Sequence, residues 1–171
     1  MHLRQLSLRL PVLTPVLLAA AVLAAPGHAT AAQSGGWQIG DWSGGIVYEA
    51  ATGRTSGCYA SRAGEGRSMV MLSWTRDGLA VTLFDPQWSL STGSAGTLEL
   101  AVDRRWSGTA DSPALTAKAR RGAIADGETA LDALKRGNTL VIRTEGAGHR
   151  FSLKGSGKAI AAMLDCYKET R

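Results

Sequence analysis

The stretch "SMVMLSWTRDGLAVTLF", residues 68–84, decides the fold class. It holds two short runs rich in apolar and β-branched residues, "SMVMLSWT" and "LAVTLF", and runs of this kind favour strands. Between them stands "RDG", in which Asp77 and Gly78 are residue types that supply the positive backbone angles of a tight hairpin. We therefore expect two antiparallel strands joined by a short turn.

Similar short runs, separated by glycine-rich turns, continue on both sides of this hairpin. Further strands are expected at residues 45–50, 57–62, 87–91, 97–103 and 115–121. In "TLELAVD", Leu98, Leu100 and Val102 fall on one face and polar residues on the other, so one side of that sheet should face solvent. The same alternation in "TAKARR" predicts that Lys118 and Arg120 point outward together.

The hydrophobic period changes near residue 126. "DGETALDALKRG" has a candidate cap at Asp126, Glu128 in the first turn, and Lys135 and Arg136 before a glycine, which predicts a short helix near 127–136. Two more strands are expected at residues 138–145 and 149–155.

The run "GSGK" at residues 155–158 looks at first like a phosphate-binding loop. Such a loop needs a glycine where this chain has Ser152, and a serine or threonine where it has Ala159. The alternative is that Ser156 caps a helix near 157–168, whose apolar stripe is formed by Ile160, Met163, Leu164 and Tyr167. The sequence therefore predicts no nucleotide cofactor.

Taken together, the expected strands and helices predict a fold class that is mainly β (α+β). The expected arrangement is an antiparallel β-sandwich or barrel-like sheet with two helices.

The first residues are typical of a secretory signal peptide. Arg4 and Arg9 precede an apolar run too short to span a bilayer comfortably, and Ala29 and Ala31 suit signal peptidase. We expect residues 1–31 to be removed, 32–36 to be a flexible spacer and 37–171 to form a single β-rich domain. The expected location is the periplasm or the secreted fraction, with no membrane span after cleavage.

The chain has two cysteines, Cys58 and Cys166. Because an exported chain passes through an oxidising compartment, the two thiols are expected to form one disulfide. That bridge would join an early strand to the C-terminal helix.

Residues suited to catalysis or metal binding are few. Of three histidines only His149 follows the leader, so no paired-histidine metal site and no metal cofactor are expected. Asp77, Asp85 and Asp126 stand beside glycine or proline, or at a cap, where their side chains satisfy backbone amides. A hydrolase with a carboxylate pair assembled in three dimensions stays open.

The charge pattern gives no sign of nucleic-acid binding. The 19 lysines and arginines exceed the 14 acidic residues, but two of the arginines lie in the leader and the rest are scattered singly or in pairs.

Five tryptophans are a surplus for a chain of this size. Burial is their ordinary role, and the alternative is that some stand exposed as a stacking platform for a glycan or a protein partner. The candidates for such binding are Trp37, Trp42, Trp88 and Trp106.

Several motifs together resemble the invasion-associated locus B family of small exported proteins of Gram-negative bacteria. They are "GDW" at residues 40–42, the cysteine strand at Cys58, "WSLSTG", "LELAVD", "LDALKRGNTLVI" and "FSLKGSGKAIAAM". The chain departs from that family in having a single cysteine pair where the family usually has more. The resemblance implies a β-rich periplasmic or surface-associated domain, linked in its namesake to invasion of host cells, with no established catalytic residues.

The sequence leaves three hypotheses about the function of this chain. The leading hypothesis is a non-enzymatic exported domain that contacts another envelope or host protein. The second is a binding module for a glycan or small ligand that uses exposed tryptophans, and the third is the hydrolase described above.

Overall fold

The structure is a computed structural model that describes residues 36–171 apart from 50 and 145. The expected signal peptide at 1–31 and nearly all of the spacer lie outside the described residues. The strands are β1 (Trp37–Ile39), β2 (Trp42–Tyr48), β3 (Thr55–Ala63), β4 (Met69–Thr75), β5 (Gly78–Phe84), β6 (Thr97–Val102), β7 (Trp106–Asp111), β8 (Ala114–Thr116), β9 (Ala119–Ala123), β10 (Thr139–Thr144) and β11 (Ala147–Ser152). The helices are α1 (Gly127–Arg136), α2 (Ser156–Glu169) and a short 3₁₀ turn, η1 (Glu65–Arg67).

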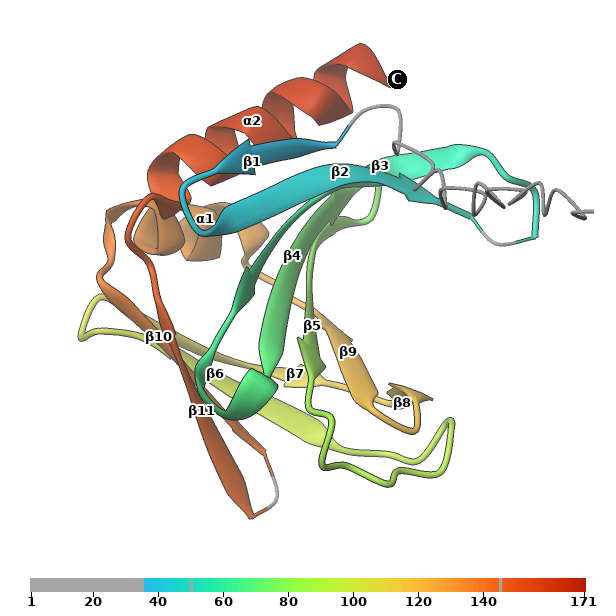
Figure 1. Cartoon of the computed structure of the whole chain (residues 1–171), viewed down its shortest axis with the longest axis vertical. Coiled ribbons are helices and arrows are strands. Elements are labelled where there is room, and N and C mark those ends of the chain that lie inside the picture. The colour runs from blue at the N-terminus through green and yellow to red at the C-terminus, as the bar shows by residue number, and fades with distance from the viewer. Residues whose placement is uncertain (1–35, 50, 145) are drawn as a thin grey trace, which may run out of the picture. The chain divides into compact units, whose positions relative to one another are not determined.

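The strands form two antiparallel sheets (Figure 1). The larger has the order β1-β2-β3-β4-β5-β9-β8, and the smaller has the order β11-β10-β6-β7. They are arranged as an open sandwich and do not close into a barrel. The mainly β prediction is confirmed, and of its two arrangements the chain adopts the sandwich.

One hydrophobic cluster joins both sheets and both helices. Its fully buried members include Trp42, Leu72, Phe151, Ile160 and Met163. Helix α2 packs on β2, β3 and α1, and the two helices lie together at one end of the strands (Figure 1). Neither helix has the length and apolar character needed to cross a membrane.

The hairpin at residues 69–84 forms as expected, with one correction. Thr75 pairs with Gly78, so the loop consists of Arg76 and Asp77. Gly78 has φ +96°, but among the described non-glycine residues only Arg67 and Asp103 have positive φ, so the prediction for Asp77 is wrong. The Asp77 amide donates to the Thr75 hydroxyl, which holds a local turn, and the left-handed conformation falls one residue later on glycine, where no Cβ opposes it.

Both predicted helices are present, but only α1 begins with the predicted capping residue. The Asp126 side chain accepts a hydrogen bond from the Thr129 amide and caps α1, as expected. The prediction that Ser156 caps α2 is wrong, because Gly155 occupies the cap position with φ +84°. The Ser156 hydroxyl instead donates to the Leu134 carbonyl at 2.7 Å, which ties α2 to α1.

The strand expected at residues 87–91 does not form. Asp85 accepts a hydrogen bond from the Gln87 amide and holds a turn at this point. The backbone then runs as a loop, in which the Leu90 amide donates to the Ala117 carbonyl. Strand-like composition is outweighed here by the turn that follows β5.

The segment at residues 115–121 is a hairpin of β8 and β9, not one strand. The turn between them shifts the alternation of side chains, so Arg120 points inward and is only 6% exposed. Its Nη1 donates to the carbonyls of Ser94 and Ser112. The prediction that Lys118 and Arg120 point outward together is therefore wrong.

The predicted disulfide between Cys58 and Cys166 is confirmed, with the two Cα atoms 6.1 Å apart. Cys58 lies in β3 and is fully buried, and Cys166 lies in the last turns of α2. The bridge fixes the C-terminal part of α2 to the larger sheet.

Candidate functional site

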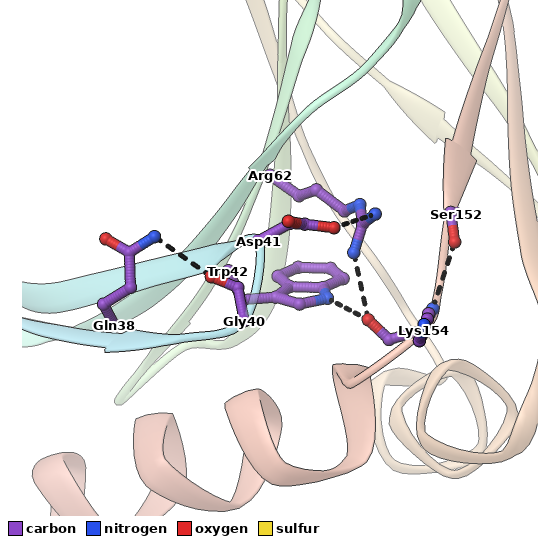
Figure 2. A network of polar contacts seen from close by, with 7 residues as sticks. All are labelled: Gln38, Gly40, Asp41, Trp42, Arg62, Ser152 and Lys154. Atoms are coloured by element: carbon purple, nitrogen blue, oxygen red, sulfur yellow. Dashed lines mark hydrogen bonds and ion pairs between the residues drawn. The ribbon is translucent and has the colours of Figure 1, made fainter.

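The "GDW" motif forms the corner between β1 and β2 (Figure 2). Gly40 turns the chain with φ +59°, and the Trp42 ring is fully buried. Trp42 Nε1 donates to the Lys154 carbonyl at 3.1 Å, and Arg62 donates to the same oxygen at 3.0 Å. Arg62 also bonds Asp41 at 2.9 Å. The motif therefore holds the segment that leads into α2, and Trp42 offers no open face to a ligand.

The rings of two other candidate tryptophans, Trp37 and Trp106, pack over glycines of the sheets. A Cβ at Gly44 would come within 2.0 Å of the Trp37 ring, and a Cβ at Gly108 within 2.7 Å of the Trp106 ring. Both rings are partly buried against the core. They lie in different sheets, so the structure does not bring them together into one platform.

Trp88 belongs to a separate cluster with His149 and Asp85. The Trp88 and His149 rings meet edge to face at 5.8 Å. His149 Nε2 is buried without a hydrogen-bond partner, and Asp85 Oδ2 lies 3.8 Å away, beyond hydrogen-bonding distance. Asp85 uses its other oxygen to hold the turn at Gln87, as the sequence predicted. The cluster joins the loop after β5 to β11.

No three His, Cys, Asp or Glu side chains of the described region converge as a metal site would require.

An open depression of about 830 Å³ lies where the end of β2, the start of β3, the β4–β5 turn, β8, β9 and the end of α2 meet. We call it the arginine groove. Its charged lining residues are Arg54, Arg76, Arg121, Arg171, Glu49 and Asp77. Guanidinium groups outnumber carboxylates among these side chains.

A second depression, of about 550 Å³, continues from the first. The two share Thr75, Asp77, Leu115 and Arg121. We call the second one the small-residue pocket, because its further lining includes Gly78, Ala80, Pro113, Ala114 and Ala123. Because they share lining residues, the two depressions adjoin. We refer to them together as the channel, with the arginine groove as its cationic end and the small-residue pocket, whose lining also includes Asp111, as its apolar end.

Exposed apolar side chains gather at this channel. Among the described residues, the large hydrophobic side chains that stand exposed are Tyr48, Met69 and Leu115. Tyr48 is 55% exposed and Leu115 is 52% exposed, and both line the arginine groove. Sequence reasoning missed both residues. No local motif marks Leu115, which lies where the β8–β9 register shifts between Ala114 and Thr116.

The disulfide positions one wall of the groove. Thr170 follows Cys166 by one helical turn and donates to its carbonyl at 3.0 Å, and the Thr170 hydroxyl lies 3.9 Å from Cys58 Sγ. The Arg171 guanidinium lies over the Tyr167 ring, 5.0 Å from its centroid. The end of α2 thus presents Tyr167, Thr170 and Arg171 to the groove from a covalently fixed turn.

The fold and the site define a class: a disulfide-bonded, open two-sheet sandwich with two helices and an arginine-lined groove. Its fold is similar to that of invasion associated protein B from Bartonella henselae, known from a crystal structure, with a TM-score of 0.54 and 18% identity. The match covers 80% of this chain and 99% of that one, and at this identity it establishes likeness of fold alone. No protein-family model matches the chain, and no curated protein matches it.

Proposed function

We propose that this chain is an exported, non-enzymatic protein of the bacterial envelope that acts by binding a partner protein in the arginine groove. The observation that carries the proposal is the exposure of Tyr48 and Leu115 within one groove. Exposed apolar side chains set among polar and charged ones are typical of protein-binding surfaces, where tyrosine and arginine supply much of the binding energy.

Export is supported by two independent features. The first residues have the charge and apolar pattern of a signal peptide. The Cys58–Cys166 disulfide is of the kind that persists in oxidising compartments. The name of the structural neighbour adds an association with invasion as a context, and we propose that the partner is another envelope or host protein.

A binding role, rather than catalysis, is supported by the state of the reactive groups. The two sulfurs are bonded to each other, so neither serves as a nucleophile. The His149 Nε2 is buried, and Asp85 bonds a backbone amide in a turn. The glycan hypothesis has less support, because Trp42 is fully buried and the exposed aromatic side chain is a tyrosine.

Site-specific photocrosslinking tests the proposal. A photoreactive residue would replace Tyr48 or Leu115 in the full chain, and the variants would be irradiated in envelope extracts. Met69 is the matched control, because it is also an exposed apolar residue of the larger sheet but does not line the groove. We expect one adduct of the same mass from positions 48 and 115 and none from 69. Equal labelling at all three positions, or no adduct at 48 and 115, would refute the proposed function.

A further inference from the structure

The channel has a chemical polarity that narrows the choice of partner. Resting on the function proposed above, we infer that it binds an extended peptide segment of the partner, with carboxylates at one end and small apolar side chains at the other. The carboxylates lie among Arg54, Arg76 and Arg171, and the apolar side chains fill the small-residue pocket.

The cationic end has guanidinium groups free to take new partners. In the part of the chain that the structure describes, no carboxylate lies within ion-pair distance of Arg54 or Arg171. Arg76 meets Asp77 at 3.8 Å, but both side chains are 85% exposed, so solvent weakens that pair. Guanidinium groups bind carboxylates in a bidentate geometry that is stronger than a neutral hydrogen bond.

At the middle of the channel, residues that line both depressions would contact the peptide segment of the partner. Leu115 and Arg121 line both depressions, so an apolar side chain of the partner contacts Leu115 as the segment passes. The Arg121 Nη2 lies 3.4 Å from the Ser73 hydroxyl, which holds this guanidinium over the sheet.

The apolar end has room because its lining is small. Ala80, Ala114 and Ala123 project only methyl groups, and Gly78 projects none. Side chains of valine or leucine size would bury apolar surface there, which favours binding.

A peptide fits this lining better than a nucleic acid or an anionic membrane does. Glu49, Asp77 and Asp111 stand among the arginines and in the pocket, and they would repel a continuous polyanion. A segment of mixed character can place its carboxylates away from them. The exposed Tyr48 and Leu115 also match apolar side chains rather than phosphate groups.

The test uses the full-length, disulfide-bonded protein and a fluorescein-labelled peptide with glutamates at one end and valines at the other. Its matched analogue carries glutamine at each glutamate position. Fluorescence anisotropy should show the acidic peptide binding about tenfold more tightly, as expected for one or two charge-assisted contacts. Arg54→Gln and Arg171→Gln should each weaken binding by about threefold to tenfold. Arg104→Gln, an exposed arginine outside the channel, should leave binding unchanged.

The outcomes separate this inference from the proposed function. Equal binding of the two peptides, or binding that Arg104→Gln weakens as much as Arg54→Gln, overturns the inference. Binding to phosphatidylglycerol vesicles without binding to the peptide also overturns it. If no peptide binds while positions 48 and 115 still crosslink, the inference fails and the proposed function stands. If crosslinking is absent too, both fail.

Discussion

At the scale of single residues, the buried Arg120 links the loop between β5 and β6 to the segment between β7 and β8. Its guanidinium donates to the carbonyls of Ser94 and Ser112 at 3.1 and 2.9 Å. Arg120→Met should lower the free energy of unfolding by about 2 kcal/mol, because the buried Ser112 carbonyl loses its donor and the Ser94 carbonyl keeps only the Ala114 amide. Urea denaturation measures this, with Arg104→Met as an exposed control expected to stay within about 0.5 kcal/mol. Similar losses for the two variants would contradict this role.

We expect Asp103 to make the free energy of unfolding depend on pH in the acid range. Its pKa is lowered, chiefly because the Asn138 amide donates to it at 2.9 Å, with a further hydrogen bond from the Thr139 amide at 3.0 Å. A lowered pKa in the folded state means that the carboxylate stabilises the fold above the unfolded pKa of about 3.9. This stabilisation is lost as the pH falls through the folded pKa.

Asp103→Asn should therefore reduce the urea midpoint at pH 7, and the difference from wild type should shrink toward zero as the pH falls below about 4. Urea denaturation at a series of pH values checks this. A difference that stays constant or grows on acidification would rule out this linkage.

Some residue roles could be read from the sequence and others could not. The alternation of Leu98, Leu100 and Val102 correctly gives their buried face, since β6 is regular. Arg120 was misplaced because the turn before β9 carries no glycine or proline, and one unrecognised turn reverses the face of every residue after it. Leu115 precedes that turn, and its exposure was missed because it lies at the register shift between Ala114 and Thr116, which no local residue type marks.

At the scale of elements, the contact between the two helices depends on one buried hydroxyl. Ser156 is 1% exposed and donates to the Leu134 carbonyl at 2.7 Å. Ser156→Ala should cost about 1 to 2 kcal/mol, because the carbonyl loses its partner in a buried position. The matched control is Ser152→Ala, whose hydroxyl is exposed and should cost less than about 0.5 kcal/mol. Thermal unfolding of the two variants compares them, and equal melting temperatures would contradict the role of Ser156.

Most elements could be predicted because their signals are local. The turn "RDG" marks the β4–β5 hairpin, and α1 carries its cap and charges within its own sequence. The strand prediction at residues 87–91 was wrong because hydrogen bonds to residues distant in sequence, such as Ala117, hold this segment as a loop. The start of α2 was placed one residue late for the same kind of reason, since Ser156 bonds another helix.

At the scale of the whole molecule, the disulfide is the main covalent constraint on α2. It closes a sequence separation of 108 residues, for which chain-entropy arguments give roughly 4 to 5 kcal/mol. Reduction should lower the urea midpoint and expose two reactive thiols, while the oxidised protein labels with none. Peptide binding should also weaken on reduction, because the end of α2 forms a wall of the groove. Equal midpoints with and without reductant would show that the bridge does not stabilise the fold.

The sandwich and the groove lie beyond what the sequence predicts. Alternation identifies strands, but it does not say that β10 pairs with β6 rather than with a nearer strand. The arginine groove draws its lining from six segments spread over the chain, so no local motif marks it. The cysteine pair was the exception, because two thiols in an oxidising compartment allow one internal pairing.

The most direct test of the account is nuclear magnetic resonance of the ¹⁵N-labelled, oxidised protein during titration with the acidic peptide. We predict that the amide signals of Tyr48, Leu115 and Tyr167 shift with a common binding curve, while the five tryptophan indole signals stay in place. Shifts centred on Trp37, Trp88 or Trp106, with the groove residues unmoved, would contradict the claim that the arginine groove is the binding surface.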